Sequence, residues 1–550
     1  MSTKRILLAV SCLLCLITSA RAVSFQKPKA FPGSSTDGRD ADENPSIATD
    51  GQGHWVAVWS NADINSFGSA DDANIAVSRS TDNGATWTAP ARLNSLAVGE
   101  TPQVPVFEGV PSLATDGNGT WLCAFIGGEN RVVKLVTYKQ IQVCKSTDNG
   151  ATWSDPVAVN PDDPSSYTLG RPSIASDGAG HWVLVWESSA LASNPGIGDS
   201  DIVVSTSTNG TTWSDYAMLN SEGETDSPTT GALDIEPVVA SDKNGVWVCA
   251  WNSDFKRGID GQGDREIVFA RSTDNGTTWS DQAVLNGEFD TETGLDERAA
   301  LAADGDGNWI LTWDGYTDLS SRYRIWTCAS TDDGQSWTQR LQVSENPPED
   351  DQSNPKVITD GNGKWIVVWN GTLLLSTASD FDIGISESTN IGATWSAVKA
   401  VNTDAADDGL RYDSDPAIAT DTAGHWAVIW ETNDPENGDL DIWRAISKEA
   451  GGGNPLAIVA PNGGEKWKQN KKYKIKWEPG DAGATIKLEL LRNGAVVDTI
   501  KGSTPNDGKL KWKVPSSLST GGGYKVRATS KSDGSIKDSS DGNFNVKAAK

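Results

Sequence analysis

An eight-residue phrase recurs along most of this chain, and its spacing constrains the fold more than any other feature. Four copies read Ser-x-Asp-x-Gly-x-Ser/Thr-Trp and two are degraded; the six occupy residues 80–87, 146–153, 206–213, 272–279, 330–337 and 388–395. In the degraded copies Thr208 and Asn390 align with the acidic position. An Asp-x-Gly turn before a Trp stabilises a strand connection, because the carboxylate accepts backbone N–H bonds while Gly takes a conformation that other residues resist. Recurrence about every 60 residues indicates a repeat architecture.

A second sequence signature precedes each copy of this motif, which we call the box. It consists of a short apolar strand, a turn containing Gly, and a Trp-rich strand. It occurs seven times, at residues 45–59, 111–125, 172–186, 237–251, 299–313, 355–369 and 416–430. A third strand follows each hairpin, and a fourth strand follows each box Trp. The repeating unit is therefore expected to be a four-stranded antiparallel sheet.

The two signatures differ in number, and this difference predicts how the repeat closes. Strands one to three occur seven times, but the box and fourth strand occur six times, because the seventh unit ends at residues 439–447 without a box. Residues 24–32 precede the first unit, as a fourth strand would. Lending this segment to the seventh unit closes a ring and removes its free edges. The sequence predicts an all-β fold, a seven-bladed β-propeller over residues 23–450, closed by an N-terminal strand.

The box resembles that of the Asp-box family, the bacterial neuraminidase repeat, whose motif Ser-x-Asp-x-Gly-x-Thr-Trp lies between the third and fourth strands of a blade. The resemblance covers residues 24–450. It implies a sialidase-like propeller. Members of this family include sialidases, other glycoside hydrolases, glycan-binding proteins and assembly factors, so the resemblance fixes the fold more closely than the function.

The boxes and all three histidines fall on one face of the predicted propeller. His54, His181 and His425 occupy the same repeat position, directly before the first Trp of a second strand. A histidine at a repeated turn is more often a packing residue than a catalytic one, and the chain has no other. Ser-His-Asp, Cys-His and His-ligated metal chemistry are therefore not expected.

The opposite face carries the longer loops, where a rigid scaffold usually places its function. Three residues before the Pro that opens each first strand stand Asp42, Glu108, Leu169, Asp234, Asp296, Gln352 and Asp413. One residue before it stand Asn44, Val110, Arg171, Glu236, Arg298, Asn354 and Asp415. Because first strands line the central channel of a propeller, both sets are expected to ring its mouth.

The sialidases that this chain resembles bind a substrate carboxylate with three arginines, and use a Tyr activated by a Glu as nucleophile and an Asp as acid or base. Carried over in chain order, the matching candidates are Arg39, Asp42 or Asp63, Glu236, Arg298 and Arg411 with Tyr412. We take Asp42, Glu236, Asp296 and Tyr412 as candidate catalytic residues. The candidate ligand-binding residues are Arg39, Glu108, Arg171, Asp234, Arg298, Arg411 and Asp413. Two features depart from the sialidases: the Phe-Arg-Ile-Pro signature is absent, and those enzymes have six blades.

A structural explanation of the acidic ring stands beside the functional one. Carboxylates at a channel mouth often cap strand ends or hold a cation such as Ca²⁺. Residues 40–45 and 260–266 have the oxygen-rich, turn-forming composition of calcium loops without the spacing of an EF-hand. No cofactor is expected to be required, and a structural calcium ion is compatible with this composition.

The chain changes character after residue 450. A Gly-rich linker, residues 451–454, leads to a segment of predicted strands over 455–550 that has 18 Lys and Arg against 9 Asp and Glu, although the whole chain has a formal net charge of −28. The strand pattern predicts an Ig-like β-sandwich. Pro-Asn-Gly-Gly-Glu-Lys-Trp from Pro461, Trp-Lys-Val-Pro from Trp512 and Tyr-Lys-Val-Arg from Tyr524 resemble the Kre9/Knh1-like domain of cell-wall proteins. The resemblance implies attachment to a wall or matrix polymer.

The N-terminus has the pattern of an export signal. Lys4 and Arg5 precede an apolar run, and Ala20-Arg21-Ala22 forms a cleavage site, so residues 1–22 are predicted to be a removed signal peptide. No other apolar stretch is long enough to span a bilayer. Cys123 and Cys144 lie on successive strands of one unit, where either a disulfide or two buried thiols is possible, with buried thiols favoured.

Two function classes follow from these observations. The first is a secreted or cell-surface monomer that binds carbohydrate at the propeller mouth and attaches to a wall or matrix polymer through its basic C-terminal domain. The second is a glycoside hydrolase of the exo-α-sialidase type, acting through carboxylates, Arg and Tyr at the mouth. Membrane insertion is not expected, and neither is nucleic-acid binding, because the larger acidic domain would repel phosphate.

Overall fold

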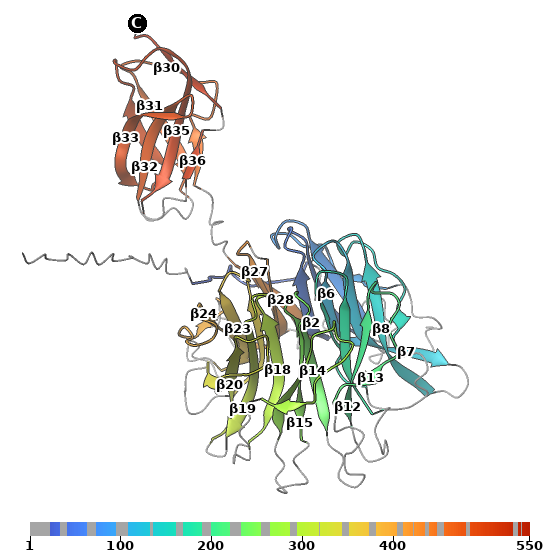
Figure 1. The fold of residues 1–550 in the computed structure, drawn as a ribbon. Coiled ribbons are helices and arrows are strands. Elements are labelled where there is room, and N and C mark those ends of the chain that lie inside the picture. Colours follow the sequence, from blue (N-terminus) through green and yellow to red (C-terminus); the bar gives the residue numbers. More distant parts are fainter. Residues whose placement is uncertain are drawn as a thin grey trace, which may run out of the picture. The chain divides into compact units, whose positions relative to one another are not determined.

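The computed structural model consists of β-strands and loops in two compact units, residues 1–446 and 447–550 (Figure 1). It describes residues 22–32, 41–62, 73–94, 108–131, 136–160, 169–189, 200–220, 233–254, 265–285, 294–317, 320–343, 351–372, 381–403, 411–421, 423–434, 439–447, 456–479, 485–531, 537–540 and 542–549. The signal-peptide prediction falls outside these residues, apart from Ala22. Within the described ranges no helix occurs, so none could cross a membrane.

The first unit contains seven four-stranded antiparallel sheets among its described residues. Six follow the chain order of the repeat, with the strands in each sheet neighbouring one another in sequence. These are β2 (Asp42–Thr49), β3 (Trp55–Asn61), β4 (Asn74–Ser80) and β5 (Ala91–Arg92); β6 (Gly109–Thr115), β7 (Trp121–Arg131), β8 (Val136–Ser146) and β9 (Val157–Ala158); β10 (Ser173–Ser176), β11 (Trp182–Ser188), β12 (Asp201–Ser207) and β13 (Ala217–Met218); β14 (Asp234–Ser241), β15 (Trp247–Ser253), β16 (Glu266–Ser272) and β17 (Ala283–Val284); β18 (Asp296–Ala303), β19 (Trp309–Thr317), β20 (Ser320–Ser330) and β21 (Leu341–Gln342); and β22 (Gln352–Thr359), β23 (Trp365–Gly371), β24 (Asp382–Ser388) and β25 (Lys399–Ala400).

The seventh sheet takes its fourth strand from the other end of the unit. It consists of β26 (Tyr412–Thr420), β27 (Trp426–Asp434), β28 (Asp439–Ile446) and β1 (Lys29–Ala30). Lys29 pairs with Arg444, and Ala30 pairs with Trp443. Beside this pairing, the ring of Phe31 lies 5.1 Å from that of Trp59 and 5.0 Å from that of Trp87, both in the first sheet or its box. The N-terminal segment therefore contacts both the last and the first sheet.

The second strands are buried on both faces, because each sheet packs between two others. In β3 the residues Trp55 to Trp59 are at most 1% exposed. In an isolated sheet alternate residues would face solvent, but here both sets enter apolar clusters shared with neighbouring sheets. The second-strand tryptophans are the largest fully buried side chains of the unit.

Each box stabilises the turn between a third and a fourth strand. In the first copy Asp82 Oδ1 accepts from the Ser80 hydroxyl and the Thr86 N–H, both at 2.8 Å, and Trp87 Nε1 donates to Gly84 O at 2.9 Å. Burial acts to raise the pKa of Asp82, but hydrogen bonds from Thr86 and Ser80 outweigh it and lower that pKa. The box is therefore a local structural element.

The third box differs from its sequence alignment. Ser207 pairs with Trp182, as Ser146 pairs with Trp121 in the preceding sheet. Asn209 Oδ1 then accepts from the Thr212 N–H at 2.8 Å, as Asp148 Oδ1 does from Thr152. Asn209, not Thr208, occupies the acidic position, so the turn is one residue shorter.

The second unit has two sheets around one core. The first is β29 (Ala457–Ala460), β31 (Lys472–Glu478) and β34 (Lys509–Lys513). The second comprises β30 (Lys466–Lys468), β32 (Thr485–Arg492), β33 (Ala495–Pro505), β35 (Gly521–Ser530), β36 (Lys537–Ser539) and β37 (Phe544–Lys547). Side chains from both sheets, among them Trp477, Leu488, Trp512 and Val526, form a single buried cluster.

Second-strand tryptophans should contribute more to stability than box tryptophans. We expect Trp247→Ala, in fully buried β15, to lower the free energy of unfolding by about 3 to 5 kcal/mol through the cavity it leaves. Trp279→Ala, at the half-buried box of the same sheet, should cost clearly less. Denaturant unfolding of the two variants measures the difference; equal losses would contradict this ranking.

Candidate functional site

The innermost strands carry an irregularity at one repeated position. Six first strands have a β-bulge directly before the residue that opens the apolar run, at 43/46, 109/112, 235/238, 297/300, 353/356 and 414/417. Each bulge contains the Pro that opens the first strand, or Ala299 in the fifth sheet. The residue before it has positive φ in all six: Asn44 (55°), Val110 (54°), Glu236 (54°), Arg298 (54°), Asn354 (55°) and Asp415 (44°). A bulge re-aims side chains, and a β-branched Val in this region is a genuine outlier. The strain is repeated around the channel and places this position at its wall.

The first strands enclose a cavity of about 330 Å³ at this level. Its wall includes all seven residues of the set directly before the Pro position, namely Asn44, Val110, Arg171, Glu236, Arg298, Asn354 and Asp415. The wall also includes residues that follow on the first strands, among them Ser46, Ser112, Ser173 and Lys356. The structure therefore brings this set together around one cavity.

Charges of both signs face the cavity. Arg171 is about half exposed, and its Nε lies 3.9 Å from Glu236 Oε1. Glu236 Oε2 accepts from Asn252 Nδ2 at 3.0 Å. Lys356 occupies the position that Ser46, Ser112 and Ser173 hold in other first strands, and burial lowers the pKa of its ammonium group while Asp415 opposes this shift. The cavity thus offers cationic donors beside carboxylate acceptors.

Arg298 is held more tightly than Arg171. Its Nε lies 2.9 and 3.1 Å from the two oxygens of Asp314, and its Nη2 also donates to Asp314. The guanidinium carbon lies 5.2 Å from the centroid of the Tyr323 ring. Because this fork already binds one carboxylate, Arg298 is less available to a ligand than Arg171.

A layer of acids lies directly behind the ring and was missed by the sequence analysis. Glu187, Asp314 and Glu431 each follow the second Trp of a second strand. Burial, with Glu236 nearby, raises the pKa of Glu187 to about 7; burial, with Asp415 nearby, raises that of Glu431 to about 8. Glu431 Oε1 accepts from the Asn44 N–H at 2.6 Å, so it also supports the bulge of the next sheet. An acidic residue on an otherwise apolar Trp-rich strand was the available signal.

The acids three residues before the Pro position lie elsewhere. Asp42, Glu108, Asp234 and Asp413 are at most 3% exposed and do not line the cavity. Asp234 accepts from Trp251 Nε1 at 2.9 Å and from Asn220 Nδ2 at 2.8 Å, while Asp413 accepts from Thr432 and Asn402. The expectation that this set rings the mouth is therefore wrong for these four residues, because they are buried and bind neighbouring strands and loops of the first unit.

Glu108, Asp42 and Asp296 of this set also bind other parts of the protein and do not line the cavity. Glu108 accepts from Asn94 at 2.8 Å, and Asp42 accepts from Asn61 at 2.5 Å. Asp296 is half-buried, pairs with Gly315 and also lies outside the cavity wall. None of the three faces the cavity within the described structure.

The arginine and tyrosine candidates do not converge on the cavity. Arg39 and Asp63 lie outside the described residues. Arg411 stacks over the ring of Trp443 at 4.5 Å, and Tyr412, 43% exposed, stacks on Phe381 at 4.3 Å between centroids. Of the two proposed clamp arginines that the structure describes, Arg298 lies at the cavity wall and Arg411 does not.

A different Tyr–Glu pair lies close to the cavity. The Tyr323 hydroxyl donates to Glu297 Oε2 at 3.0 Å. Burial and the Glu297 charge raise the pKa of Tyr323 to about 12. The Tyr323 hydroxyl is therefore the neutral, donating form, and Glu297 lies within hydrogen-bonding distance of its proton.

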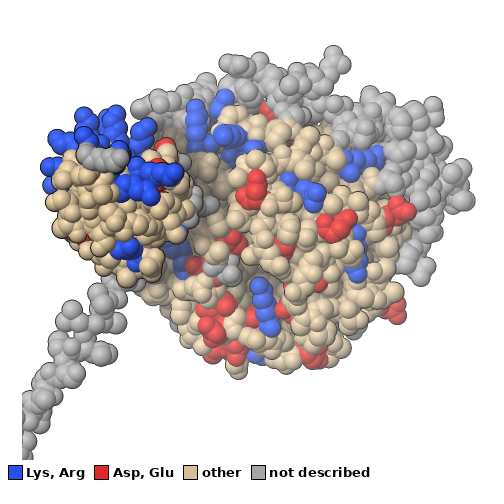
Figure 2. Space-filling model, turned by 90° about the horizontal axis from the view of Figure 1, so that it is seen from above, with Lys and Arg blue, Asp and Glu red and all other residues tan. Residues whose placement is uncertain are grey.

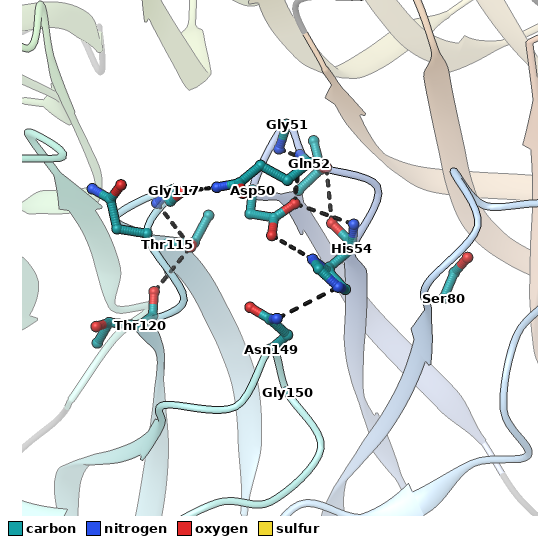
Figure 3. A network of polar contacts seen from close by, with 12 residues as sticks. Asp50, Gly51, Gln52, His54, Ser80, Thr115, Gly117, Thr120, Asn149 and Gly150 are labelled. Carbon is teal, nitrogen blue, oxygen red and sulfur yellow. Dashed lines mark hydrogen bonds and ion pairs between the residues drawn. The ribbon is translucent and has the colours of Figure 1, made fainter.

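The histidines belong to hairpin turns and contact an Asp of the same turn, as their repeated position indicated. Asp50 Oδ1 accepts the N–H groups of Gln52 and His54 at 2.7 and 3.1 Å, and Asp50 Oδ2 lies 2.6 Å from His54 Nδ1 (Figure 3). His54 Nε2 contacts Asn149 of the next box at 3.4 Å. His181 with Asp177 and His425 with Asp421 repeat the Asp–His contact.

Neither a metal cluster nor a disulfide occurs within the described ranges. No group of three His, Cys, Asp or Glu side chains there is arranged to hold a metal ion. Most of the segment 260–266 falls outside those ranges, so the calcium prediction stays a prediction. Cys123 and Cys144 are directly paired on β7 and β8, both are buried free thiols, and burial raises the pKa of each.

Glu431 should make the stability of the first unit depend on pH. The unfolded side chain loses its proton near pH 4.5, whereas the folded one keeps it to about pH 8, so this contribution is complete below pH 4.5 and is lost as pH rises towards 8. Glu431→Gln mimics the protonated form. Its advantage in free energy of unfolding over the natural chain should grow from pH 5 to pH 8, by at most about 1.4 kcal/mol per pH unit.

Denaturant unfolding at several pH values measures this trend. Glu187→Gln should show the same trend, ending nearer pH 7. An advantage that stays constant across this range would contradict the assignment of the shift to Glu431.

Two family models match the chain. The model of the BNR repeat-like domain matches residues 53–367 and 180–471, and that of the Kre9/KNH-like N-terminal Ig-like domain matches residues 460–546. No curated protein matches the chain.

Several solved structures resemble this one at low identity. A Dyadobacter fermentans protein of unknown function is 15% identical, with 78% of this chain and 99% of that chain covered and a TM-score of 0.46. The NanB sialidase of Streptococcus pneumoniae is 15% identical, with 78% and 70% covered and a TM-score of 0.41. The GH93 α-L-arabinofuranosidase of Fusarium graminearum is 13% identical, with 77% and 97% covered and a TM-score of 0.39. On the match of the family model to more than half of its residues, the chain belongs to the BNR repeat-like family.

Proposed function

We propose that this protein is an exported propeller that binds a glycan in the channel cavity, while its basic C-terminal domain attaches it to a wall or matrix polymer. The observation that carries the proposal is the cavity itself: about 330 Å³, lined by Arg171, Glu236, Lys356 and Asp415, the last three on first strands that carry a bulge. A concave site of this size with a few fixed polar groups is typical of small-ligand binding.

The side chains at the wall suit a polyhydroxylated ligand. Glu236 and Asp415 can accept hydrogen bonds from sugar hydroxyls, and Arg171 and Lys356 can donate to ring, hydroxyl or carboxylate oxygens. The apolar first-strand residues between them can pack against the carbon skeleton. Glu236 and Asp415 lie within the strands β14 and β26, so less conformational entropy is lost on binding than at residues of a loop.

A glycoside hydrolase is the second candidate, because burial raises the pKa values of two acids behind the cavity. Glu187 and Glu431, with pKa values of about 7 and 8, have the property that a general acid needs. Glu236 or Asp415 at the cavity wall would then serve as base or nucleophile. In this case the reaction would be glycosidic cleavage, not binding alone.

The proposed site needs a closed channel, and we propose that the seven sheets are blades of one ring. The pairing of β1 with β28 supports this, as does the contact of β26 with β2, which completes a cycle of contacts between successive first strands. Deletion of residues 23–32 should lower the thermal midpoint of the first unit by several degrees, since it exposes β28 and removes Phe25 and Phe31 from the core. An unchanged midpoint would contradict this closure.

Removal of the cavity cations should weaken glycan binding. We expect Arg171→Ala and Lys356→Met each to lower affinity about tenfold or more for an oligosaccharide selected on a glycan array, because each removes a charge-assisted hydrogen bond. Lys243→Gln, on an exposed turn of a first hairpin, is the matched control and should leave affinity unchanged.

Chromogenic glycosides, including α-sialosides, distinguish binding from catalysis. Turnover that Glu236→Gln or Glu187→Gln abolishes would establish the hydrolase. Binding without turnover supports the first proposal, and affinity that is equal in all the variants would contradict the cavity as the site.

A further inference from the structure

The three-stranded sheet of the second unit carries an unusual arrangement of lysines. Within β31 and β34, Lys472 lies opposite Lys513, Lys474 opposite Lys511, and Lys476 opposite Lys509. All six side chains are exposed. They form three successive cross-strand pairs of like charge, which we call the lysine ladder.

Strand alternation explains why the ladder occupies a single face. The residues between the lysines, among them Ile475, Trp477 and Trp512, are buried in the core of the unit. Successive side chains of a strand point to opposite faces, so the lysines all project from the outer side of the sheet. Figure 2 shows Lys and Arg atoms gathered on this unit, with few Asp or Glu among them.

The ladder is unfavourable for the folded unit by itself. Like charges directly opposite each other across two strands destabilise a sheet. Among the described side chains, none of the six lysines forms an ion pair, and the exposed acids Glu478 and Asp507 lie at one end only. On the other sheet, by contrast, Glu489 pairs with Lys487 at 2.6 Å and with Arg527 at 2.8 Å.

From this contrast we infer that the lysine ladder is a docking surface for a linear acidic polysaccharide. The ammonium groups form two rows, one on each strand, and successive lysines within a row are about 6.8 Å apart. The two rows present an array of point charges to a chain with repeated carboxylate or sulfate groups. Bound anions would relieve the repulsion between the lysine pairs. Electrostatic docking of this kind is strong in sum and weakly specific.

Other polyanions fit the surface less well. Recognition of a single-stranded nucleic acid needs exposed aromatic rings for base stacking, and the ladder has none, since Tyr473 and Trp512 face inward. Binding in a membrane interface needs an apolar face beside the charges, whereas Val459 is the exposed large apolar residue that the structure shows on these three strands.

This inference rests on the attachment role proposed for the C-terminal domain, but not on the channel cavity. The direct test compares two full-length variants of equal net charge. K509Q/K511Q/K513Q removes one row of the ladder, and the control K466Q/K501Q/K537Q removes three exposed lysines of the other sheet. Binding is measured to polygalacturonate, for carboxylate, and to heparin, for sulfate.

We expect the ladder variant to bind at least one of these polymers about tenfold or more weakly, and the slope of log Kd against log salt to fall by about two to three. Its thermal stability should be equal to or higher than that of the natural chain, because the substitutions remove one charge from each like-charged pair. The control should lose clearly less affinity for the same polymer.

Three results would overturn the inference: equal losses in both variants, unchanged affinity of the ladder variant for both polymers, or a larger loss towards duplex DNA or anionic vesicles than towards either polysaccharide. The ladder variant should keep the affinity of the cavity for its oligosaccharide. If the ladder variant keeps its affinity for both polymers while Arg171→Ala weakens oligosaccharide binding, the attachment surface alone is refuted. If the ladder variant loses polymer affinity while Arg171→Ala leaves oligosaccharide binding unchanged, the cavity alone is refuted.

Discussion

The structure of the first unit depends on the packing of sheets on both faces of each second strand. Trp, Val and Ile side chains fill both faces of β3, β11 and their equivalents, and small polar side chains such as Thr312 and Ser78 are buried among them within the described strands. Polar residues are tolerated at the outer boxes and at the inner edge, where the first strands meet the channel. The bulges at that inner edge place Glu236, Lys356 and Asp415 around one cavity.

The spacing of the repeats was sufficient to predict the strands, the turns and the four-stranded unit, because these follow from local periodicity and from Asp, Gly and Trp at fixed positions. The chemistry of the channel was only partly predictable. In the sequence the two acidic sets have the same spacing, but in the structure the residues directly before the Pro line the cavity, whereas Asp234 and Asp413 bind Asn220 and Asn402 of a preceding sheet. These contacts join different sheets through residues 14 and 11 positions apart, so the periodicity of a single strand does not reveal them.

The same reason explains the residues that were missed. Glu187 and Glu431 lie on apolar strands, and their pKa values are set by burial between sheets, which a single strand does not reveal. Arg411 and Tyr412 matched a family pattern, yet their stacking on Trp443 and Phe381 directs them away from the cavity. In the third box, Asn209 rather than Thr208 accepts the turn N–H bonds, a one-residue change that alignment by Gly and Trp concealed.

The central claim is that the ring of residues on the bulged first strands binds the ligand. The most direct measurement is a crystal structure of the full chain with the oligosaccharide that it binds most tightly. The account predicts electron density for a sugar in the channel cavity, within hydrogen-bonding distance of Arg171, Glu236 or Lys356. Density at the box face or on the outer strands, with the cavity filled by water alone, would contradict it.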